Sequence, residues 1–157
     1  MTRRAVLTSL ARQLLRKKLT ISVCESCTGG MLGSMITDRP GSSKYFVGGI
    51  IAYSNEVKRK VIGVKPATLR KYGSVSAEVV KEMARGVRRK LITDIGIAIT
   101  GIAGPAGGSK KKPVGLVYLG VASKQKVSVK MLLLKGSRDT IRKKACTEAL
   151  YLLIDCL

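Results

Sequence analysis

Residues 94–101 read DIGIAITG, an apolar run that contains no charged side chain after Asp94. A strand with one face in water alternates apolar and polar residues, whereas a continuous apolar run is typical of a strand covered on both faces. Other apolar runs before and after it alternate with stretches of helical periodicity. This alternation predicts an α/β domain built in layers, with residues 94–100 inside its sheet.

Capping and turn residues divide the rest of the chain into elements. Ser54, Ser76 and Ser137 are good helix N-caps, and Pro66 suits a first helical turn. We predict helices at residues 3–17, 28–38, 54–63, 66–73, 76–91 and from 137 onward. We predict strands at residues 19–24, 45–53, 94–100, 114–122 and 127–134, the last two paired as a hairpin. Gly48 and Gly49 predict a bulge in the second strand.

The 157 residues suit one domain spanning 1–157, because no linker or repeat divides them. The composition is strongly basic, with 30 Lys and Arg against 9 Asp and Glu and a formal net charge of +21. This charge would support salt-sensitive, non-specific binding of nucleic acid. The six aromatic residues do not interleave with the basic runs, so the stacking platform of a single-strand binder is missing. A solvated basic surface explains the charge equally well.

The chain has no histidine, which excludes a Ser-His-Asp triad and a His-ligated zinc. We therefore expect neither a metal nor another cofactor, and a general base must be Lys, Tyr or a carboxylate. No apolar stretch reaches the roughly 20 residues that span a bilayer, so we expect a cytoplasmic protein with no membrane partner. Residues 1–18 are basic and acid-free like a transit peptide, but their leucines have the spacing of an amphipathic helix.

Two cysteines, Cys24 and Cys27, form a C-x-x-C motif between a predicted strand and a predicted helix. This is the local setting of a thioredoxin-like dithiol. Cys24 also continues an apolar strand as a small apolar residue would, which fits reduced, buried thiols. The other two, Cys146 and Cys156, are ten residues apart and give no second zinc half-site.

Three predicted strands end in loops rich in Gly, Ser and Thr: residues 25–30, 53–58 and 100–105. In open α/β sheets, ligands bind outside the carboxyl ends of the strands. We therefore expect these three loops to meet at one crevice.

The first loop places Ser26 just before a helix whose first backbone N–H groups have no partner within the helix. Such N–H groups can hold an anion or a developing oxyanion, and Gly29 and Gly30 would let a ligand approach the backbone. The simpler alternative is an ordinary helix start with Thr28 as its cap.

The second loop contains Tyr53 at a strand end and Lys58 five residues later. A serine nucleophile needs a base, and a desolvated lysine could serve, with the tyrosine hydroxyl relaying or orienting the proton. At a pKa near 10.4, about 4 lysines in 10,000 are neutral at pH 7, so a useful base needs a pKa lower by roughly 3. The alternative is a solvated lysine in the basic run of residues 58–60.

The third loop contains Thr100, Gly101, Ala103 and Gly104 and leads to three lysines at 110–112. It lacks the Gly-Lys-Ser/Thr triplet of a Walker loop, which argues against ATP hydrolysis. Its backbone N–H groups could cradle one phosphate, with the lysines adding charge or forming a solvated tip.

Five strings occur together in this chain: ESCTGG at 25–30, GSSKYFVGGIIAYSNEVK at 41–58, GSVSAE at 73–78, TGIAGPAGG at 100–108 and KPVGLVY at 112–118. In this order they resemble the C-terminal domain of the CinA family, the competence-damage-inducible proteins that include nicotinamide mononucleotide amidohydrolases. The resemblance runs from about Leu7 to the final helix. It implies a single-domain, three-layer α/β/α sandwich with a mixed sheet.

The resemblance also implies hydrolysis of the carboxamide of nicotinamide mononucleotide to nicotinic acid mononucleotide and ammonia, in pyridine nucleotide salvage. By similarity, Ser26 is the nucleophile, Lys58 the base and Tyr53 the polarising hydroxyl. The resemblance further implies a homo-oligomer. The ligand pocket would be lined by Ser42, Ser43 and Thr100, and the phosphate would be reached by Arg138 and Arg142.

The chain departs from the family pattern at several positions. Cys24 stands where alanine is common, Ala106 interrupts a loop often richer in glycine, and the lysines at 110–112 are unusually basic. The N-terminal domain of longer family members lies outside these 157 residues, so we expect no second activity. The alternative to catalysis is a basic module that binds nucleotides or nucleic acid.

Overall fold

The computed structural model describes residues 2–157, and its elements follow the predicted alternation. The helices are α1 (Arg3–Lys17), α2 (Met31–Thr37), α3 (Asn55–Val57), α4 (Pro66–Tyr72), α5 (Ala77–Lys90) and α6 (Arg138–Cys156). Two short turns are the 3₁₀ turn η1 (Ser42–Lys44) and the π-helical turn η2 (Lys58–Ile62). The strands are β1 (Ile21–Glu25), β2 (Phe46–Ile51), β3 (Ile95–Gly101), β4 (Leu116–Ala122) and β5 (Val127–Leu133).

The strands form one mixed sheet in the order β2-β1-β3-β4-β5. Strand β1 pairs in parallel with β2 and β3, whereas β4 pairs antiparallel with both β3 and β5. Strand β3 is the middle strand, and its residues 95–100 are all buried. The prediction drawn from the apolar run is therefore confirmed.

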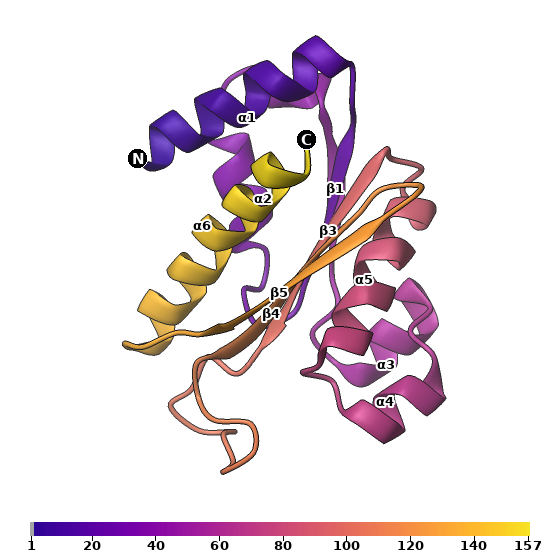
Figure 1. The fold of residues 1–157 in the computed structure, drawn as a ribbon, viewed down its shortest axis with the longest axis vertical. Coiled ribbons are helices and arrows are strands. Elements are labelled where there is room, and N and C mark those ends of the chain that lie inside the picture. The colour runs from indigo at the N-terminus through magenta and orange to yellow at the C-terminus, as the bar shows by residue number, and fades with distance from the viewer. Residues whose placement is uncertain (1) are drawn as a thin grey trace.

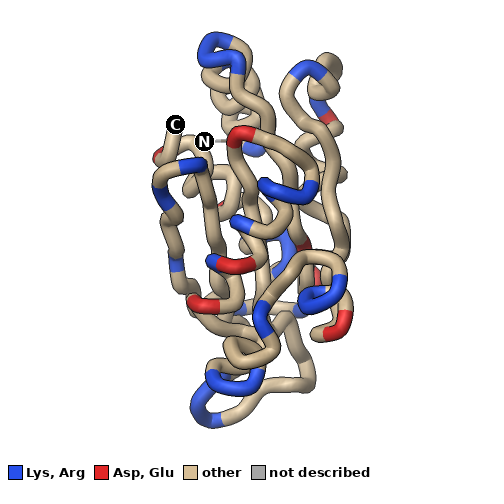
Figure 2. The backbone as a smooth tube through the Cα atoms, turned by 90° about the vertical axis from the view of Figure 1, so that its right-hand side faces the viewer, with Lys and Arg blue, Asp and Glu red and all other residues tan. Residues whose placement is uncertain are grey.

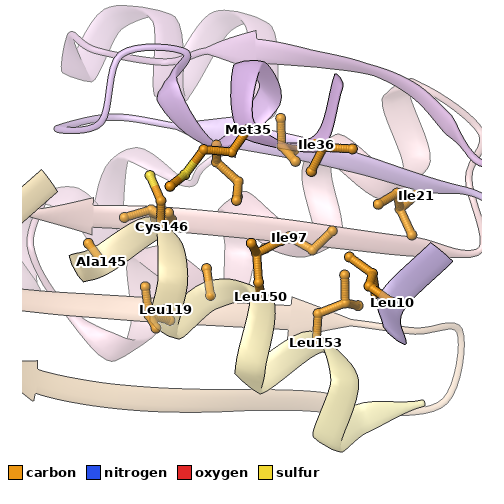
Figure 3. Packing of buried hydrophobic residues seen from close by; sticks show 14 of the residues in the cluster. Leu10, Ile21, Met35, Ile36, Ile97, Leu119, Ala145, Cys146, Leu150 and Leu153 are labelled. Atoms are coloured by element: carbon orange, nitrogen blue, oxygen red, sulfur yellow. The ribbon is translucent and has the colours of Figure 1, made fainter. Parts of the chain in front are cut away.

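The helices cover both faces of the sheet, which gives the three-layer α/β/α arrangement (Figure 1). On one face α1, α2 and α6 close over a large apolar core that includes Leu10, Ile97 and Leu150 (Figure 3). On the other face α5 packs on β3 and β4 over a smaller core that includes Val80 and Met83. Long strand β3 thus contributes alternate residues to two separate cores.

Several element boundaries differ from those predicted, each for a local reason. Helix α2 begins at Met31 instead of Thr28 or Gly29, because Gly29 and Gly30 have φ angles of +58° and +99°. Strand β1 extends to Glu25, one residue beyond the predicted end. Strand β2 does have a register irregularity, and it falls at Val47, beside the predicted glycines.

The predicted N-caps are observed. The hydroxyl oxygens of Ser54, Ser76 and Ser137 each accept a hydrogen bond from a backbone N–H of the first helical turn. The helix that Ser54 begins changes after one turn into the π-helical turn η2, which starts at Lys58 and ends at Ile62, with Gly63 as its C-cap. Such π turns inside helices often occur at functional sites.

Lys and Arg are spread along the whole length of the molecule, including both of its ends, and Asp and Glu are few and scattered (Figure 2). The charge therefore does not by itself mark one face. Within the part of the chain that is described, no helix is both long and apolar enough to cross a membrane.

Helix α5 can lie close to the sheet because β3 has a glycine beneath it. A Cβ built on Gly96 would lie 2.2 Å from the carbonyl oxygen of Ala84 and 2.9 Å from the backbone nitrogen of Arg88. Both contacts are with backbone atoms of α5, so a rotamer change cannot relieve them.

We predict that Gly96→Ala lowers the free energy of unfolding by about 2 kcal/mol or more, because overpacking forces the helix away from the sheet. Denaturant unfolding measures this change. Gly33→Ala is the matched control, since a Cβ there would meet its nearest atom at an ordinary 3.6 Å. Equal stability of the two variants would contradict the close contact.

Candidate active site

The loops that follow β1, β2 and β3 meet at one cavity of about 270 Å³, as the strand-end pattern predicts. Its walls come from these loops, from the turn before α5 and from the start of α6. The lining residues are Ser26, Cys27, Tyr53, Lys58, Ser74, Val75, Thr100, Gly101, Ile102, Ala103, Gly104, Ala106, Gly107 and Arg138. The cavity lies at the carboxyl edge of the parallel strands, the usual ligand site of such sheets.

Lys58 and Ser26 are in direct contact inside this cavity. The Lys58 Nζ lies 2.9 Å from the Ser26 Oγ and donates to the carbonyl oxygens of Ala52 (2.8 Å) and Tyr53 (3.1 Å). Lys58 is 1% exposed and Ser26 is 8% exposed. The π-helical turn begins at Lys58 and directs its side chain inward, while its neighbours Arg59 and Lys60 are exposed. The solvated-lysine interpretation of this basic run is therefore wrong.

Burial lowers the pKa of Lys58 below the ordinary lysine value of 10.5, because the charged form loses its hydration. Among the described residues, no carboxylate lies within ion-pair distance of its amine to offset this loss. The direction of the shift is the one that a lysine base requires.

The two carbonyl groups also orient the amine. A neutral lysine amine has two N–H donors and one lone pair. With the two N–H groups directed to the carbonyl oxygens of Ala52 and Tyr53, the remaining position faces the Ser26 hydroxyl. In this state the lone pair can accept the serine proton, and in the protonated state all three N–H groups have an acceptor.

The turn that carries Ser26 is held by Glu25, a residue that the sequence did not single out. Glu25 is 1% exposed, and its carboxylate accepts N–H groups from Gly30 (3.1 Å), Leu32 (3.0 Å) and Gly33 (2.8 Å). The predicted anion site at the start of α2 is therefore wrong, because an internal carboxylate already occupies these N–H groups. An acidic residue at a strand end, just before a Gly-rich helix start, was the available signal.

Arg142 holds the same turn from the side of α6. Its guanidinium donates to the carbonyl oxygens of Cys27 (3.1 Å) and Thr28 (2.8 Å). Arg142, Thr28, Gly29 and Gly30 are not among the residues that line the cavity, and Thr28 is fully buried. Arg142 was expected to reach the substrate phosphate, but in this structure it holds the turn and does not line the cavity.

Arg138 and Tyr53 lie at the cavity mouth. Arg138 donates to the Tyr53 hydroxyl (3.2 Å) and to the carbonyl oxygen of Gly104 (2.8 Å). Tyr53 is 60% exposed, and its hydroxyl contacts Arg138 rather than Ser26 or Lys58. Its backbone carbonyl, not its hydroxyl, is the group that contacts the lysine.

The third loop contributes Thr100, Gly101, Ala103 and Gly104 to the cavity wall, as predicted. The hydroxyl of Thr100 donates to the backbone carbonyl of Ser74 (2.8 Å), another cavity residue that the sequence did not single out. In the lysine run, Lys112 is neither a solvated tip nor a cavity residue, since it donates to the carbonyl oxygens of Tyr72 and Val75. It fastens the loop to the segment before α5.

Ser42 and Ser43 do not reach the cavity. They form the turn η1 that precedes β2, next to the residue pair Phe46 and Ile21 where β2 and β1 begin. Strands β1 and β2 are parallel, so this turn lies at the edge opposite the cavity. The implied pocket role of these two serines does not hold within this chain.

Cys24, Cys27 and Cys146 are free and buried. Burial raises the pKa of Cys24 to about 12 and that of Cys27 to about 11. A dithiol redox motif needs an accessible thiol with a lowered pKa. The structure therefore favours packing thiols over the redox alternative.

Among residues 2–157, no three side chains of Cys, Asp or Glu gather where they could hold a metal ion. A larger hollow of about 470 Å³ lies between the first turn of α1 and residues 38–40. It is lined by three arginines but by no paired nucleophile and base, and Asp38 there forms an ion pair with Arg3. The chemistry is therefore concentrated in the cavity of Ser26 and Lys58.

A three-layer α/β/α domain with a buried serine–lysine pair at the carboxyl edge of its sheet is the class that this fold and site define. The model of the CinA C-terminal domain matches residues 3–157, and the chain belongs to this family. A competence-damage inducible protein of Moorella thermoacetica is 54% identical over 140 residues, which are 89% of this chain. These residues are 34% of that relative, so the chain spans about a third of the length of the curated relatives it matches.

Solved structures agree with this assignment. The competence damage-inducible protein A from Klebsiella pneumoniae superposes with a TM-score of 0.95 at 30% identity, covering 99% of this chain and 96% of that one. A competence/damage inducible protein from Agrobacterium tumefaciens superposes with a TM-score of 0.89 at 35% identity, covering 96% and 94%. The fold implied by the sequence resemblance is confirmed.

Burial of Lys58 should be measurable as a pH-dependent stability. The folded chain binds fewer protons than the unfolded chain between the lowered pKa and 10.5, so the free energy of unfolding should rise with pH there. One group contributes at most about 1.4 kcal/mol per pH unit. We predict that Lys58→Met removes this contribution, as measured by denaturant unfolding of both proteins from about pH 6 to pH 10. Identical slopes in the two proteins would contradict a lowered pKa.

We also predict that a thiol reagent at about pH 8 modifies Cys156 in the native protein and modifies the three buried cysteines only after denaturation. The reason is that burial keeps those thiols both protonated and inaccessible. Counting modified thiols by mass spectrometry checks this. Rapid loss of two native thiols on mild oxidation would instead support the dithiol alternative.

Proposed function

We propose that this protein is an amidohydrolase that converts nicotinamide mononucleotide and water to nicotinic acid mononucleotide and ammonia. The observation that carries the proposal is the buried contact of 2.9 Å between the Lys58 Nζ and the Ser26 Oγ. The substrate follows from the resemblance of the five sequence strings and from membership of the CinA family.

The proposed reaction has two halves. Lys58 takes the proton of the Ser26 hydroxyl while the Oγ attacks the carboxamide carbon. The tetrahedral intermediate expels ammonia, which takes the proton back from Lys58, and leaves an acyl ester on Ser26. Lys58 then takes a proton from water as the water attacks this ester. The bond between the acyl carbon and the Ser26 Oγ breaks, the Oγ takes the proton from Lys58, and the acid product leaves the regenerated serine.

The negative oxygen of each intermediate needs an N–H donor. At the start of α2, the N–H groups of Gly30, Leu32 and Gly33 donate to Glu25, and those of Gly29 and Met31 donate to backbone carbonyls, so these five do not serve. Ile102 donates to Leu116 on β4, and because N–H directions alternate along a strand, the Gly101 N–H faces the β1 side where Ser26 lies. We assign the oxyanion to the Gly101 N–H.

The phosphate end of the substrate is assigned to the cavity mouth. Arg138 is the arginine that lines the cavity, and an arginine can bind a phosphate through two parallel hydrogen bonds. Tyr53, which accepts a hydrogen bond from Arg138, would contact the same end of the substrate. Arg142 is left out because both of its contacts hold the turn at Cys27 and Thr28.

The main alternative is a basic module that binds nucleotides or nucleic acid without catalysis. Binding an anion requires exposed cations, and Lys and Arg residues occur along the whole length of the molecule (Figure 2), many of them exposed. It does not require an unpaired lysine amine to be buried against a serine hydroxyl, which is a costly arrangement. The buried pair therefore favours catalysis.

We predict that Ser26→Ala and Lys58→Ala each reduce ammonia release from nicotinamide mononucleotide about a thousandfold or more, because nucleophile and base act as one unit. The double variant should be no worse than the single ones. An enzyme-coupled ammonia assay measures these rates.

Arg59→Ala is the control, since this exposed neighbour of Lys58 lies outside the cavity and should keep the original rate. Undiminished ammonia release in both the Ser26 and Lys58 variants would reject the proposed mechanism. Absence of ammonia release from the unmodified protein would reject the proposed function.

A further inference from the structure

Thr100 has a buried hydroxyl whose hydrogen-bonding capacity is partly used by the protein. Thr100 is 1% exposed and lines the cavity, and its Oγ1 donates to the backbone carbonyl of Ser74 at 2.8 Å. A threonine hydroxyl has one proton and two lone pairs. Because the proton is directed to Ser74, only the lone pairs remain for a ligand.

The strand register places this hydroxyl beside the reacting groups. Glu25 on β1 pairs with Ile99 on β3, and the Ser26 N–H donates to the Ile99 carbonyl. Ser26 and Thr100 are thus the residues that directly follow this pair, and the backbones of neighbouring strands lie about 4.8 Å apart in a sheet. A group attacked by the Ser26 Oγ is therefore within reach of the Thr100 Oγ1.

A hydroxyl that can only accept distinguishes an amide from an acid. The carboxamide nitrogen of a substrate has two N–H donors, so it can donate to the Thr100 lone pairs. A carboxylate oxygen has no proton to donate, and its lone pairs would face those of Thr100 in a buried, poorly solvated position. The same site therefore favours the substrate of an amide hydrolysis and disfavours its product.

We propose that Thr100, with its proton committed to the Ser74 carbonyl, is the specificity-determining residue that selects a carboxamide over the corresponding carboxylate. The Thr100 Oγ1 accepts an N–H of the scissile amide, which directs the other substituent, the carbonyl oxygen, toward Gly101. The carboxylate product is repelled from the same position and leaves. This inference rests on the proposed amidohydrolase function and adds the residue that recognises the carboxamide of the substrate.

The experiment measures binding instead of turnover. In a Ser26→Ala background, the dissociation constants of nicotinamide mononucleotide and nicotinic acid mononucleotide are measured by calorimetry for Thr100, Thr100→Val and Thr100→Ser proteins. With threonine or serine at this position, the amide should bind more tightly than the acid. With valine, the dissociation constant of the acid divided by that of the amide should fall about tenfold, because the hydroxyl that accepts the amide N–H is lost.

The matched control is Thr93→Val in the same background. Thr93 is also a buried threonine next to β3, and its hydroxyl donates to the Ile95 carbonyl at the strand end far from the cavity. This variant loses a comparable buried hydrogen bond but should keep the original ratio. If Thr100→Val does not fold, as judged by its thermal unfolding, Thr100→Ala makes the same test with a smaller side chain.

The possible failures are distinguishable. An unchanged ratio in a folded Thr100→Val or Thr100→Ala protein overturns the role of Thr100 alone. If neither nucleotide binds and the unmodified protein releases no ammonia, the proposed function is refuted, and the inference about Thr100 is refuted with it. A ratio that falls equally in Thr93→Val also overturns the inference, because the effect would then be one of stability.

Discussion

Among the residues that the structure describes, no carboxylate pairs with the buried amine of Lys58, and the rest of the site depends on how the chain accommodates this group. Two backbone carbonyls at the end of β2 and one serine hydroxyl at the end of β1 surround it. A buried cation with only neutral partners is disfavoured, so its pKa falls. Burial therefore shifts this amine toward its neutral form, in direct contact with the Ser26 hydroxyl.

The neighbouring charges are arranged so that they do not cancel this effect. Glu25 is equally buried and lies next to Ser26 in the sequence, yet its carboxylate is directed to three backbone N–H groups at the start of α2. Arg142 is directed to two carbonyls of the same turn. Each charge is therefore satisfied by the backbone and fixes the turn that carries Ser26, while the amine of Lys58 keeps no ionic partner. Rigid support of this kind is what a preorganised site needs.

Much of the fold followed from local patterns. The apolar run at 94–100 predicted the middle strand, the serines at 54, 76 and 137 predicted helix starts, and the strand-end loops predicted the place of the cavity. These features depend on residues close together in the chain, so periodicity and capping chemistry suffice. The failures were Ser42, Ser43, Arg142 and the helix-start residues 28–30, whose positions depend on which sheet edge, turn or side chain they pack against. Ser74 was missed because its backbone carbonyl acquires its role only from a distant partner, Thr100. Glu25 was missed although its partners lie only five to eight residues further along the chain.

By itself, the sequence determined the α/β class, the absence of histidine chemistry and the strand-end loops that meet at the cavity. The tertiary structure alone decided that Lys58, and not Arg59 or Lys60 of the same basic run, is buried against Ser26. The basic run alone does not show which of its three charged side chains is buried, but the π-helical turn that begins at Lys58 buries the first and leaves the other two exposed. Desolvation arises from atoms that segments far apart in the chain bring together, here residues 26, 52 and 58, and no local pattern contains that information.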